Sequence, residues 1–292
     1  MSYLKKFAWL EKNKKQEKNN PTTIQKTESK NQIVLFDMDG TLTEPRKSFD
    51  NVLMPSISSL SRKSQIGIVT GSDLDYLQQQ LKPILDSPSI RQKLHLLPCN
   101  GTKYYSPPSS PHAEFKLVSE VNMRQTLGSN AFKQIMIALI EQQSSIDLYG
   151  IPLTGHFISY RGSMINWCPI GRNANDEQRK RFVEYDLLSS PSYREKIIEN
   201  LQISFDMRGV ANLVTIKLGG STSFDIYPKG WDKTYCLKHF QDWETWFVGD
   251  RCEENGNDKE IYDLLLKKGK AFQTKNTNNT RLIIDNIILS KL

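Results

Sequence analysis

The chain has 292 residues, with 39 basic and 32 acidic side chains and a formal net charge of +7. Its apolar fraction of 38% and charged fraction of 24% are typical of a soluble globular chain and exclude wholesale disorder. No run approaches the roughly 18 apolar residues that a membrane span needs, so we expect no membrane partner. The opening residues lack an apolar run followed by a small-residue cleavage site, so we also expect no secretory signal.

Most of the positive charge lies in the first thirty residues, which contain eight lysines and three glutamates. The rest of the chain is close to neutral, so the overall charge does not indicate a nucleic-acid partner. We interpret residues 1–31 as a lysine-rich, disordered tail, because such a segment is usually a solvated extension.

The cysteines and histidines have no paired spacing of the kind that metal sites use. We therefore expect neither a zinc site nor a disulfide framework, and a reducing, cytoplasmic compartment fits best. We treat all four histidines as structural. The residues concerned are Cys99, Cys168, Cys236 and Cys252, and His95, His112, His156 and His239.

The first element after the tail is the continuous apolar run at 33–36, which is typical of a buried strand in a parallel sheet. Short apolar strands and helical stretches then alternate. This order predicts a doubly wound, Rossmann-like α/β core with a parallel sheet, whose ligands bind beyond the carboxyl ends of the strands. We expect helices at 50–61 and 74–81 and further strands at 67–69 and 94–97, with Ser72 or Asp73 capping the second helix.

The alternation stops at the proline-rich loop 105–111, and the pattern that follows mixes strands and helices as an α+β domain does. The core pattern resumes with a helix from Trp231 and a strand at 245–248. We therefore predict a core formed by residues 32–107 and 229–292, with an inserted α+β cap at 108–228. Inside the cap we expect helices at 130–143, 176–188 and 192–203, and strands at 156–160, 164–168, 213–218 and 223–227.

Two acids, Asp37 and Asp39, follow the first predicted strand. The chain splays at the end of a strand, so both carboxylates can reach one crevice. Two acids before a flexible Gly40 suit an aspartyl nucleophile with an adjacent general acid/base. Taken alone, such a pair is more often a turn with two solvated acids.

Four more polar residues favour the catalytic interpretation. Thr70 and Ser72 follow the second strand, where a hydroxyl group can hold a phosphate oxygen. Lys233 opens a later helix and can neutralise phosphoryl charge. Asp250 follows the last clear strand and can complete a site for Mg²⁺, which prefers one or two carboxylates together with phosphate and water. Each residue is a weak signal alone, but together they indicate phosphoryl transfer.

The chain contains FDMDGTLT, VTGSD, GWDK and VGD, which resemble the four motifs of the haloacid dehalogenase-like phosphotransferases. The resemblance narrows to the eukaryotic-type phosphomannomutases through RGSMINWCPIGR at 161–172 and GGSTSFD at 219–225. It covers about residues 33–263.

This resemblance implies a role for each matching residue. Asp37 resembles the nucleophile and Asp39 the general acid/base, supported by Lys233, Thr70 and Ser72. The implied magnesium ligands are Asp37, the backbone carbonyl of Asp39, and Asp250. The implied sugar-phosphate binders are Arg46, Arg161, Arg172, Arg179, Ser223 and Asp225.

The chemistry of arginine is consistent with the sugar-phosphate role of the four arginines, because a guanidinium group binds a phosphate dianion bidentately better than lysine does. Arg172 and Arg179 are seven residues apart, so they share a face if one helix carries both. Asn166 is also a candidate for this site, without an assigned role.

Three positions depart from the family pattern. The family's PENG motif reads PCNG at 98–101 here, so Cys99 replaces its acid. Ser163 stands where the family has glycine. Leu264 stands where the family has an aspartate of a second cation site, which weakens the case for a second site here.

The resemblance implies an enzyme that interconverts mannose 6-phosphate and mannose 1-phosphate through a phosphoaspartate and a hexose bisphosphate. It also implies Mg²⁺ as cofactor, hexose 1,6-bisphosphate as activator, a homodimer formed through the cap, and a place in GDP-mannose biosynthesis.

Three alternatives stay open: a sugar-phosphate phosphatase on the same scaffold, a phosphoglucomutase, and a non-catalytic sugar-phosphate binder. The cap arginines favour a mutase, because a mutase must hold the distal phosphate in both substrate orientations. The intact acids and Lys233 argue against a non-catalytic binder.

Overall fold

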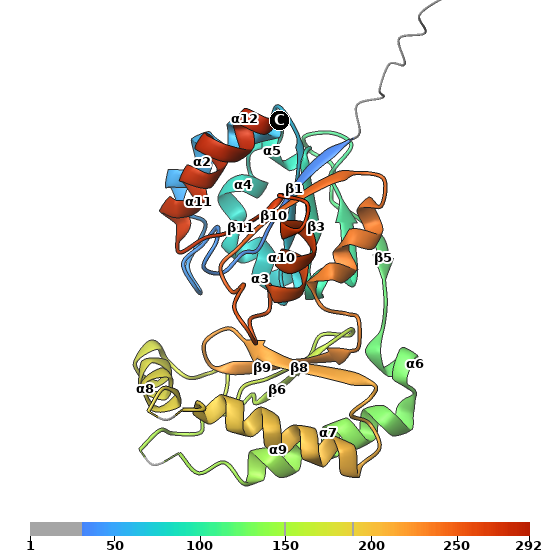
Figure 1. The fold of residues 1–292 in the computed structure, drawn as a ribbon, viewed down its shortest axis with the longest axis vertical. Helices are drawn as coiled ribbons and strands as arrows, with labels where there is room; N and C mark the ends of the chain where they lie inside the picture. The colour runs from blue at the N-terminus through green and yellow to red at the C-terminus, as the bar shows by residue number, and fades with distance from the viewer. Residues whose placement is uncertain (1–30, 149, 189) are drawn as a thin grey trace, which may run out of the picture. The chain divides into compact units, whose positions relative to one another are not determined.

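The computed structural model describes residues 31–148, 150–188 and 190–292. The predicted tail at 1–31 lies outside the described residues except for Asn31. Two β-sheets organise this part of the chain, one of seven strands and one of four (Figure 1). Below, the part around the larger sheet is called the core and the part around the smaller sheet the cap. The fold class expected from the sequence is confirmed. None of the described helices is both long and apolar enough to cross a lipid bilayer.

The core sheet has seven strands in the order β11-β10-β1-β2-β3-β4-β5. The first five are parallel neighbours, and the last two pair antiparallel. The strands are β1 (Gln32–Phe36), β2 (Gln65–Val69), β3 (Leu94–Leu97), β4 (Lys103–Ser106), β5 (Lys116–Glu120), β10 (Glu244–Gly249) and β11 (Ala271–Gln273).

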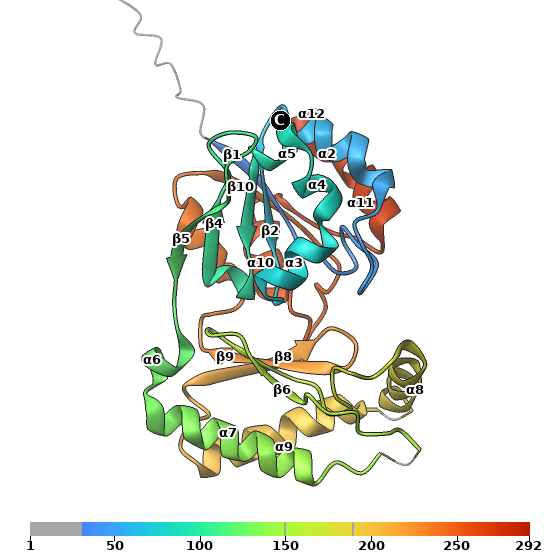
Figure 2. The same cartoon turned by 180° about the vertical axis from the view of Figure 1, so that it is seen from behind.

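Helices cover both faces of this sheet, as Figures 1 and 2 show from opposite sides. Successive residues of β1 therefore pack into different cores: Val34 and Phe36 into one, Ile33 and Leu35 into the other. On the first face lie α2 (Met54–Ser61), α3 (Leu74–Gln80), α4 (Lys82–Leu85), α5 (Pro88–Arg91), α11 (Thr277–Ile283) and the π-helix η4 (Ile284–Ile288), followed by α12 (Leu289–Lys291). On the second lie the 3₁₀ helix η3 (Lys233–Phe240) and α10 (Lys259–Leu266).

Two details of the core differ from the sequence expectations. Residues 116–120 fall in the range predicted for the cap, yet they form β5, which pairs with β4 at the edge of the core sheet. The helix expected from Trp231 is a 3₁₀ helix that begins at Lys233, because the side chain of Asp232 caps it by accepting a hydrogen bond from the Thr234 amide.

The cap has a four-stranded antiparallel sheet in the order β6-β7-β9-β8. Its helices α7 and α9 lie on the side of this sheet away from the core (Figures 1 and 2). The strands are β6 (Ile158–Tyr160), β7 (Ile165–Trp167), β8 (Val214–Gly219) and β9 (Ser223–Pro228), and the helices are α6 (Met123–Leu127), α7 (Ser129–Ser144), α8 (Asp176–Asp186) and α9 (Tyr193–Met207).

Alternation along the cap strands decides which side chains face the core. Trp167 and Phe224 stack on each other inside the apolar cluster beneath α7 and α9. Their neighbours Asn166 and Asp225 are opposite each other in the register of β7 and β9, and they line a cavity on the other face.

A buried ion pair joins α8 and α9 to the turn between β8 and β9. The Arg194 Nε donates to Asp186 Oδ2 at 2.7 Å, and its Nη1 donates to the Gly220 carbonyl at 3.0 Å. The two side chains are only 8% and 3% exposed. Removing one partner of a buried pair leaves a charge without compensation, which is strongly destabilising.

We therefore predict that Asp186→Asn lowers the free energy of unfolding by about 3–5 kcal/mol, measured by urea denaturation. The control is Asp86→Asn, because Asp86 pairs with Lys82 on an exposed surface of the core. That change should alter stability by less than about 0.5 kcal/mol. Equal effects of the two substitutions would show that the buried pair does not stabilise the fold.

Candidate active site

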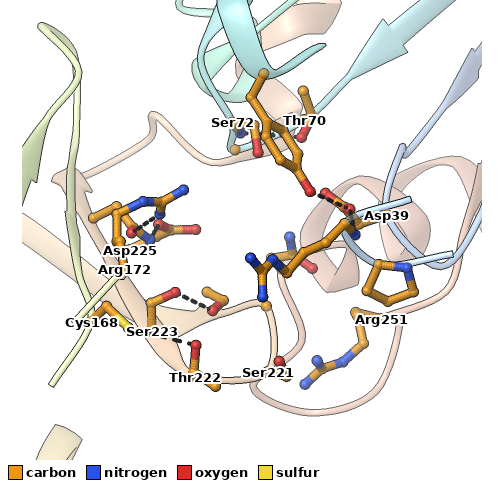
Figure 3. A pocket seen from close by; sticks show the side chains of 18 of the residues that line it. Asp39, Thr70, Ser72, Cys168, Arg172, Ser221, Thr222, Ser223, Asp225 and Arg251 are labelled. Atoms are coloured by element: carbon orange, nitrogen blue, oxygen red, sulfur yellow. Dashed lines mark hydrogen bonds between the residues drawn. The ribbon is translucent and has the colours of Figure 1, made fainter. Parts of the chain in front are cut away.

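The carboxyl ends of three adjacent parallel strands meet at one edge of the core sheet. Asp37 follows β1, Thr70 follows β2 and Asp250 follows β10, and β1 lies between the other two strands. A cavity of about 220 Å³ opens at this edge and is lined by residues of both the core and the cap. Figure 3 shows the polar side chains that converge on it.

Lys233 is buried behind Asp37 and bridges two acids. Its Nζ donates to Asp37 Oδ1 and, at 2.6 Å, to Asp258 Oδ1. The Lys233 side chain is only 1% exposed, and that of Asp258 is fully buried. Asp258 Oδ2 in turn accepts a hydrogen bond from the Arg251 amide at 3.0 Å, which fixes the carboxylate.

Burial and charge oppose each other in this cluster. Burial alone would lower the pKa of the Lys233 ammonium group, but the charges of Asp258 and Asp37 hold it above its usual value. Burial raises the pKa of Asp37, an effect that Lys233 opposes and that Asp258 and Asp250 reinforce. Lys233 therefore remains a cation, and the three carboxylates compete for positive charge.

The residues present fit a divalent cation. Carboxylate oxygens of Asp37, Asp250 and Asp258 lie within 4.8 Å of one another. Asp250 Oδ1 is buried and has no hydrogen-bond partner among the described residues. Burial, followed by the charge of Asp258, raises the pKa of Asp250 to about 6. A cation that takes oxygen ligands would reduce the repulsion among the three carboxylates and would give Asp250 Oδ1 a partner.

Gly40 allows Asp250 to approach this cluster. Its φ is +87°, and a Cβ there would lie 2.2 Å from Asp250 Oδ2. Any side chain at position 40 would therefore displace the carboxylate, which explains the glycine after the two acids.

Asp39 is held by two donors that share one oxygen. The Arg46 amide donates to Asp39 Oδ1 at 3.2 Å, and the Tyr76 hydroxyl donates to the same atom at 3.1 Å; the second contact is the dashed line at Asp39 in Figure 3. Burial raises the pKa of Asp39, although both hydrogen bonds oppose that effect. A carboxyl group with a raised pKa suits proton exchange.

The cap contributes a chain of hydrogen bonds that faces the two acids. Arg172 Nη1 donates to Asn166 Oδ1 at 2.7 Å, and Asn166 Nδ2 donates to Asp225 Oδ1 at 2.8 Å. Burial raises the pKa of Asp225, whereas the nearby Arg161 lowers it. Ser223 lines the same cavity and donates its hydroxyl hydrogen to the Gly219 carbonyl at 2.8 Å.

Three cap arginines are held by neutral groups. Arg161 Nη1 donates to the Gly71 carbonyl of the core at 2.5 Å, and Arg179 donates to the Thr222 hydroxyl at 2.7 Å. Within the described part of the chain, none of Arg161, Arg172 and Arg179 has a carboxylate within salt-bridge distance. Burial lowers the pKa of Arg172 and of Arg179, and the charge of Arg161 lowers that of Arg172 further. An anion in the cavity would relieve this repulsion.

The structure brings the sequence-predicted residues together. All of them line the cavity except Lys233, which lies buried beneath it. Arg46 also pairs with Asp176 of α8 at 2.8 Å, so it links core and cap. The helix that would have carried both Arg172 and Arg179 begins after Arg172, because the Asn175 side chain caps it. The two arginines are still adjacent, since Arg179 Nη2 donates to the Arg172 carbonyl.

Several residues of the site were not assigned from the sequence. Asp258 is the most important, and its only signal in the sequence is its position in NDKEI at 257–261, shortly after Asp250. Tyr76 gave no signal beyond its place on the helix after β2. Arg251 and Thr222 line the cavity next to assigned residues.

The positions that depart from the family pattern lie beside or outside the cavity. Cys99 is buried, and burial raises the pKa of its thiol. Ser163 is also buried and accepts a hydrogen bond from the Thr102 hydroxyl at 2.6 Å. Leu264 is 42% exposed on α10. Neither Leu264 nor any of the four histidines is among the described residues that line the cavity.

Comparison with known proteins agrees with this arrangement. The family model described as eukaryotic phosphomannomutase matches residues 53–290. The chain belongs to that family. It is 36% identical to the phosphomannomutase of Arabidopsis thaliana over 234 residues, which cover 79% of this chain and 87% of that protein. It is also 36% identical to the phosphomannomutase of Encephalitozoon cuniculi, with 79% of this chain and 84% of that protein covered.

Solved structures support the fold of this family member. An IMP-nucleotidase of Plasmodium falciparum superposes with a TM-score of 0.62 at 15% identity, covering 89% of this chain and 67% of that one. At this identity the likeness shows a shared fold. The resemblance inferred from FDMDGTLT, VTGSD, GWDK and VGD is thus confirmed at the level of the family and its fold.

The acidic cluster generates a prediction about magnesium. We expect Mg²⁺ to stabilise the wild-type protein by about 2.7 kcal/mol at a free concentration one hundred times its Kd, because it binds only the folded cluster. Asp250→Asn should lose most of this stabilisation. Thermal unfolding at increasing Mg²⁺ concentration measures it.

The matched control is Asp263→Asn, since Asp263 is an exposed acid of α10 paired with Lys259. It should respond to Mg²⁺ as the wild type does. Equal stabilisation of the wild type and Asp250→Asn would contradict the proposed ligand.

Proposed function

We propose that this member of the phosphomannomutase family interconverts mannose 6-phosphate and mannose 1-phosphate through a phospho-Asp37 and a hexose 1,6-bisphosphate. The observation that carries the proposal is the pairing of two charged sites across one cavity. The core side holds the acid cluster with Lys233, and the cap side holds three arginines that have no carboxylate partner among the described residues. This arrangement suits a molecule with a phosphate at each end.

Asp37 is the nucleophile in this proposal. In the first transfer, phospho-Asp37 donates its phosphoryl group to a hydroxyl oxygen of the hexose monophosphate. The resulting bisphosphate turns around in the cavity and returns its other phosphate to Asp37. Lys233 stays positive throughout and stabilises the charge on the transferring phosphoryl group.

Asp39 exchanges the proton in both transfers. It accepts a proton from the attacking hydroxyl group, and it gives a proton to the leaving sugar oxygen when the bisphosphate reacts. Burial raises its pKa, which favours the protonated form that the second transfer uses. Thr70 and Ser72 line the same cavity, which supports a role for their hydroxyl groups in holding phosphoryl oxygens.

Asp37, Asp250 and the backbone carbonyl of Asp39 would hold Mg²⁺. Asp258 lies in the same cluster, but both of its oxygens already bond Lys233 and the Arg251 amide, so we propose that it positions Lys233. When bound, Mg²⁺ supplies positive charge to the phosphoryl oxygens and to the nucleophile.

The cap arginines bind the phosphate that is not reacting. Arg161, Arg172 and Arg179 can hold either the 1-phosphate or the 6-phosphate, because they recognise the charge and geometry of the group. Asp225 and Ser223 lie next to them and can bind sugar hydroxyl groups. Closure of the cap over the bound sugar would exclude water, which otherwise hydrolyses phospho-Asp37.

Further features belong to the same proposal. Hexose 1,6-bisphosphate acts as the activator, because it phosphorylates Asp37 at the start. Exposed apolar residues on α7 and α9, among them Ile140, Ile203 and Met207, support a homodimer through the cap. The four cysteines are free thiols, which supports a cytoplasmic location. The place in GDP-mannose biosynthesis rests on the family resemblance alone.

The wild-type protein tests this proposal directly. With Mg²⁺ and a trace of hexose 1,6-bisphosphate, we expect it to convert mannose 1-phosphate to mannose 6-phosphate and to release little free phosphate. A coupled assay of the 6-phosphate, run in parallel with a phosphate assay, measures both products.

Glucose 1-phosphate serves as the competing substrate, and omission of the bisphosphate serves as the control. Stoichiometric release of phosphate without an isomer would replace the mutase with a phosphatase. A higher kcat/KM for glucose 1-phosphate would replace it with a phosphoglucomutase. Binding without either product would leave only a sugar-phosphate binder.

A further inference from the structure

Tyr76 brings a hydroxyl group from the helix after β2 to the acid that follows β1. Its helix, α3, begins after Asp73, whose side chain accepts a hydrogen bond from the Tyr76 amide at 3.1 Å. The N-cap thus fixes the backbone that carries the ring. The Tyr76 side chain lines the cavity, and its hydroxyl donates to Asp39 Oδ1 at 3.1 Å.

The second donor to Asp39 comes from an unusual backbone conformation. Arg46 has a φ of +65°, which is costly for a residue with a Cβ. In this conformation its amide donates to the same Oδ1 atom at 3.2 Å. No described residue bonds Asp39 Oδ2. The two oxygens of one carboxyl group are therefore distinguished: Oδ1 is held by two donors, and Oδ2 is left for another partner.

We infer that Tyr76 is a positioning residue for proton transfer: with the Arg46 amide it holds Asp39 Oδ1, so that Oδ2 exchanges the proton with the sugar oxygen. This inference rests on the proposed function, because it takes Asp39 as the general acid/base. Tyr76 itself touches neither the phosphoryl group nor the transferred proton.

The transfer step shows why a fixed Oδ1 matters. When the bisphosphate reacts, the bond between phosphorus and the sugar oxygen breaks and a bond from phosphorus to Asp37 forms. The sugar oxygen takes the proton from Asp39 Oδ2, which leaves Asp39 as a carboxylate. Oδ1 can accept both hydrogen bonds before and after this step, because it is a carbonyl oxygen in the acid and a carboxylate oxygen afterwards.

The demand for this proton depends on the leaving group. A sugar alkoxide is a poor leaving group and needs the proton from Asp39, whereas the acetate released from acetyl phosphate is stable as an anion. Misplacing Asp39 should therefore slow phosphoryl transfer from the sugar and spare transfer from acetyl phosphate. A general loss of structure would slow both.

The test compares Tyr76→Phe with the wild type in single-turnover phosphorylation of Asp37, using hexose 1,6-bisphosphate and acetyl phosphate with Mg²⁺. We expect the rate with the bisphosphate to fall about ten- to a hundred-fold, the size of one hydrogen bond to a charged group. The concentration of bisphosphate that gives half of the maximal rate should be unchanged, and so should the rate with acetyl phosphate. In steady state, kcat for isomerisation should fall while KM is retained.

Tyr104→Phe is the matched control. The Tyr104 hydroxyl also makes a side-chain hydrogen bond in the core, 2.9 Å from His95 Nδ1, but Tyr104 does not line the described cavity. Its removal should leave both phosphorylation rates at the wild-type level. This comparison separates the loss of a tyrosine hydroxyl from the loss of the contact with Asp39.

An equal fall with both phosphoryl donors would overturn the inference and leave Tyr76 a structural role. An unchanged rate with the bisphosphate would overturn it as well. The proposed function can fail independently of this inference. A wild-type protein that becomes phosphorylated but forms no isomer is not a mutase. The comparison of the two leaving groups would still test the role of Tyr76. A wild type that neither donor phosphorylates would contradict both.

Discussion

The core side of the site is organised around the buried ammonium group of Lys233, which bonds two carboxylates. A cation without exposure to solvent is tolerated only when acids and hydrogen bonds compensate for it. Asp37 and Asp258 supply this compensation, and each is fixed by the core: Asp37 by the end of β1, and Asp258 by the Arg251 amide after β10. The core residue Asp232 forms the N-cap of the 3₁₀ helix that begins at Lys233. Parallel pairing of β1 with β10 brings Asp37 and Asp258 to the same edge of the sheet, where Lys233 bonds both.

The opposite signs of charge on the two sides of the cavity follow from this arrangement. The core side has more carboxylates than its single lysine can neutralise, so it attracts a divalent cation. The cap side has arginines that neutral groups hold in place, so it attracts an anion. Contacts across the gap hold the two sides together, including Lys217 of β8 with Glu260 of α10 at 2.8 Å. The proposed bisphosphate, with a phosphate at each end, would match both halves at once.

The sequence predicted the elements whose signals are local. The apolar run at 33–36 is a buried strand because both faces of the parallel sheet are covered, and acids at strand ends converge because parallel strands share one edge. Residues whose roles depend on distant contacts were not predictable in this way. Asp258 reaches Lys233 only through the fold, Tyr76 of α3 reaches Asp39 in the turn after β1, and β5 joins the core sheet through pairing with β4. Similarly, Arg172 lies outside α8 because the helix begins after its N-cap residue Asn175.

In the proposed reaction, the core side binds the reacting phosphate and the cap arginines bind the other one. A crystal structure of the Asp37→Asn protein with Mg²⁺ and hexose 1,6-bisphosphate tests it most directly, because this variant cannot accept the phosphoryl group. We predict one phosphate beside Lys233 and position 37, and the other within hydrogen-bond distance of Arg172 and Arg179. A distal phosphate that lies in solvent, or that bonds only Arg46 and Arg251 at the edge of the cavity, would contradict the account.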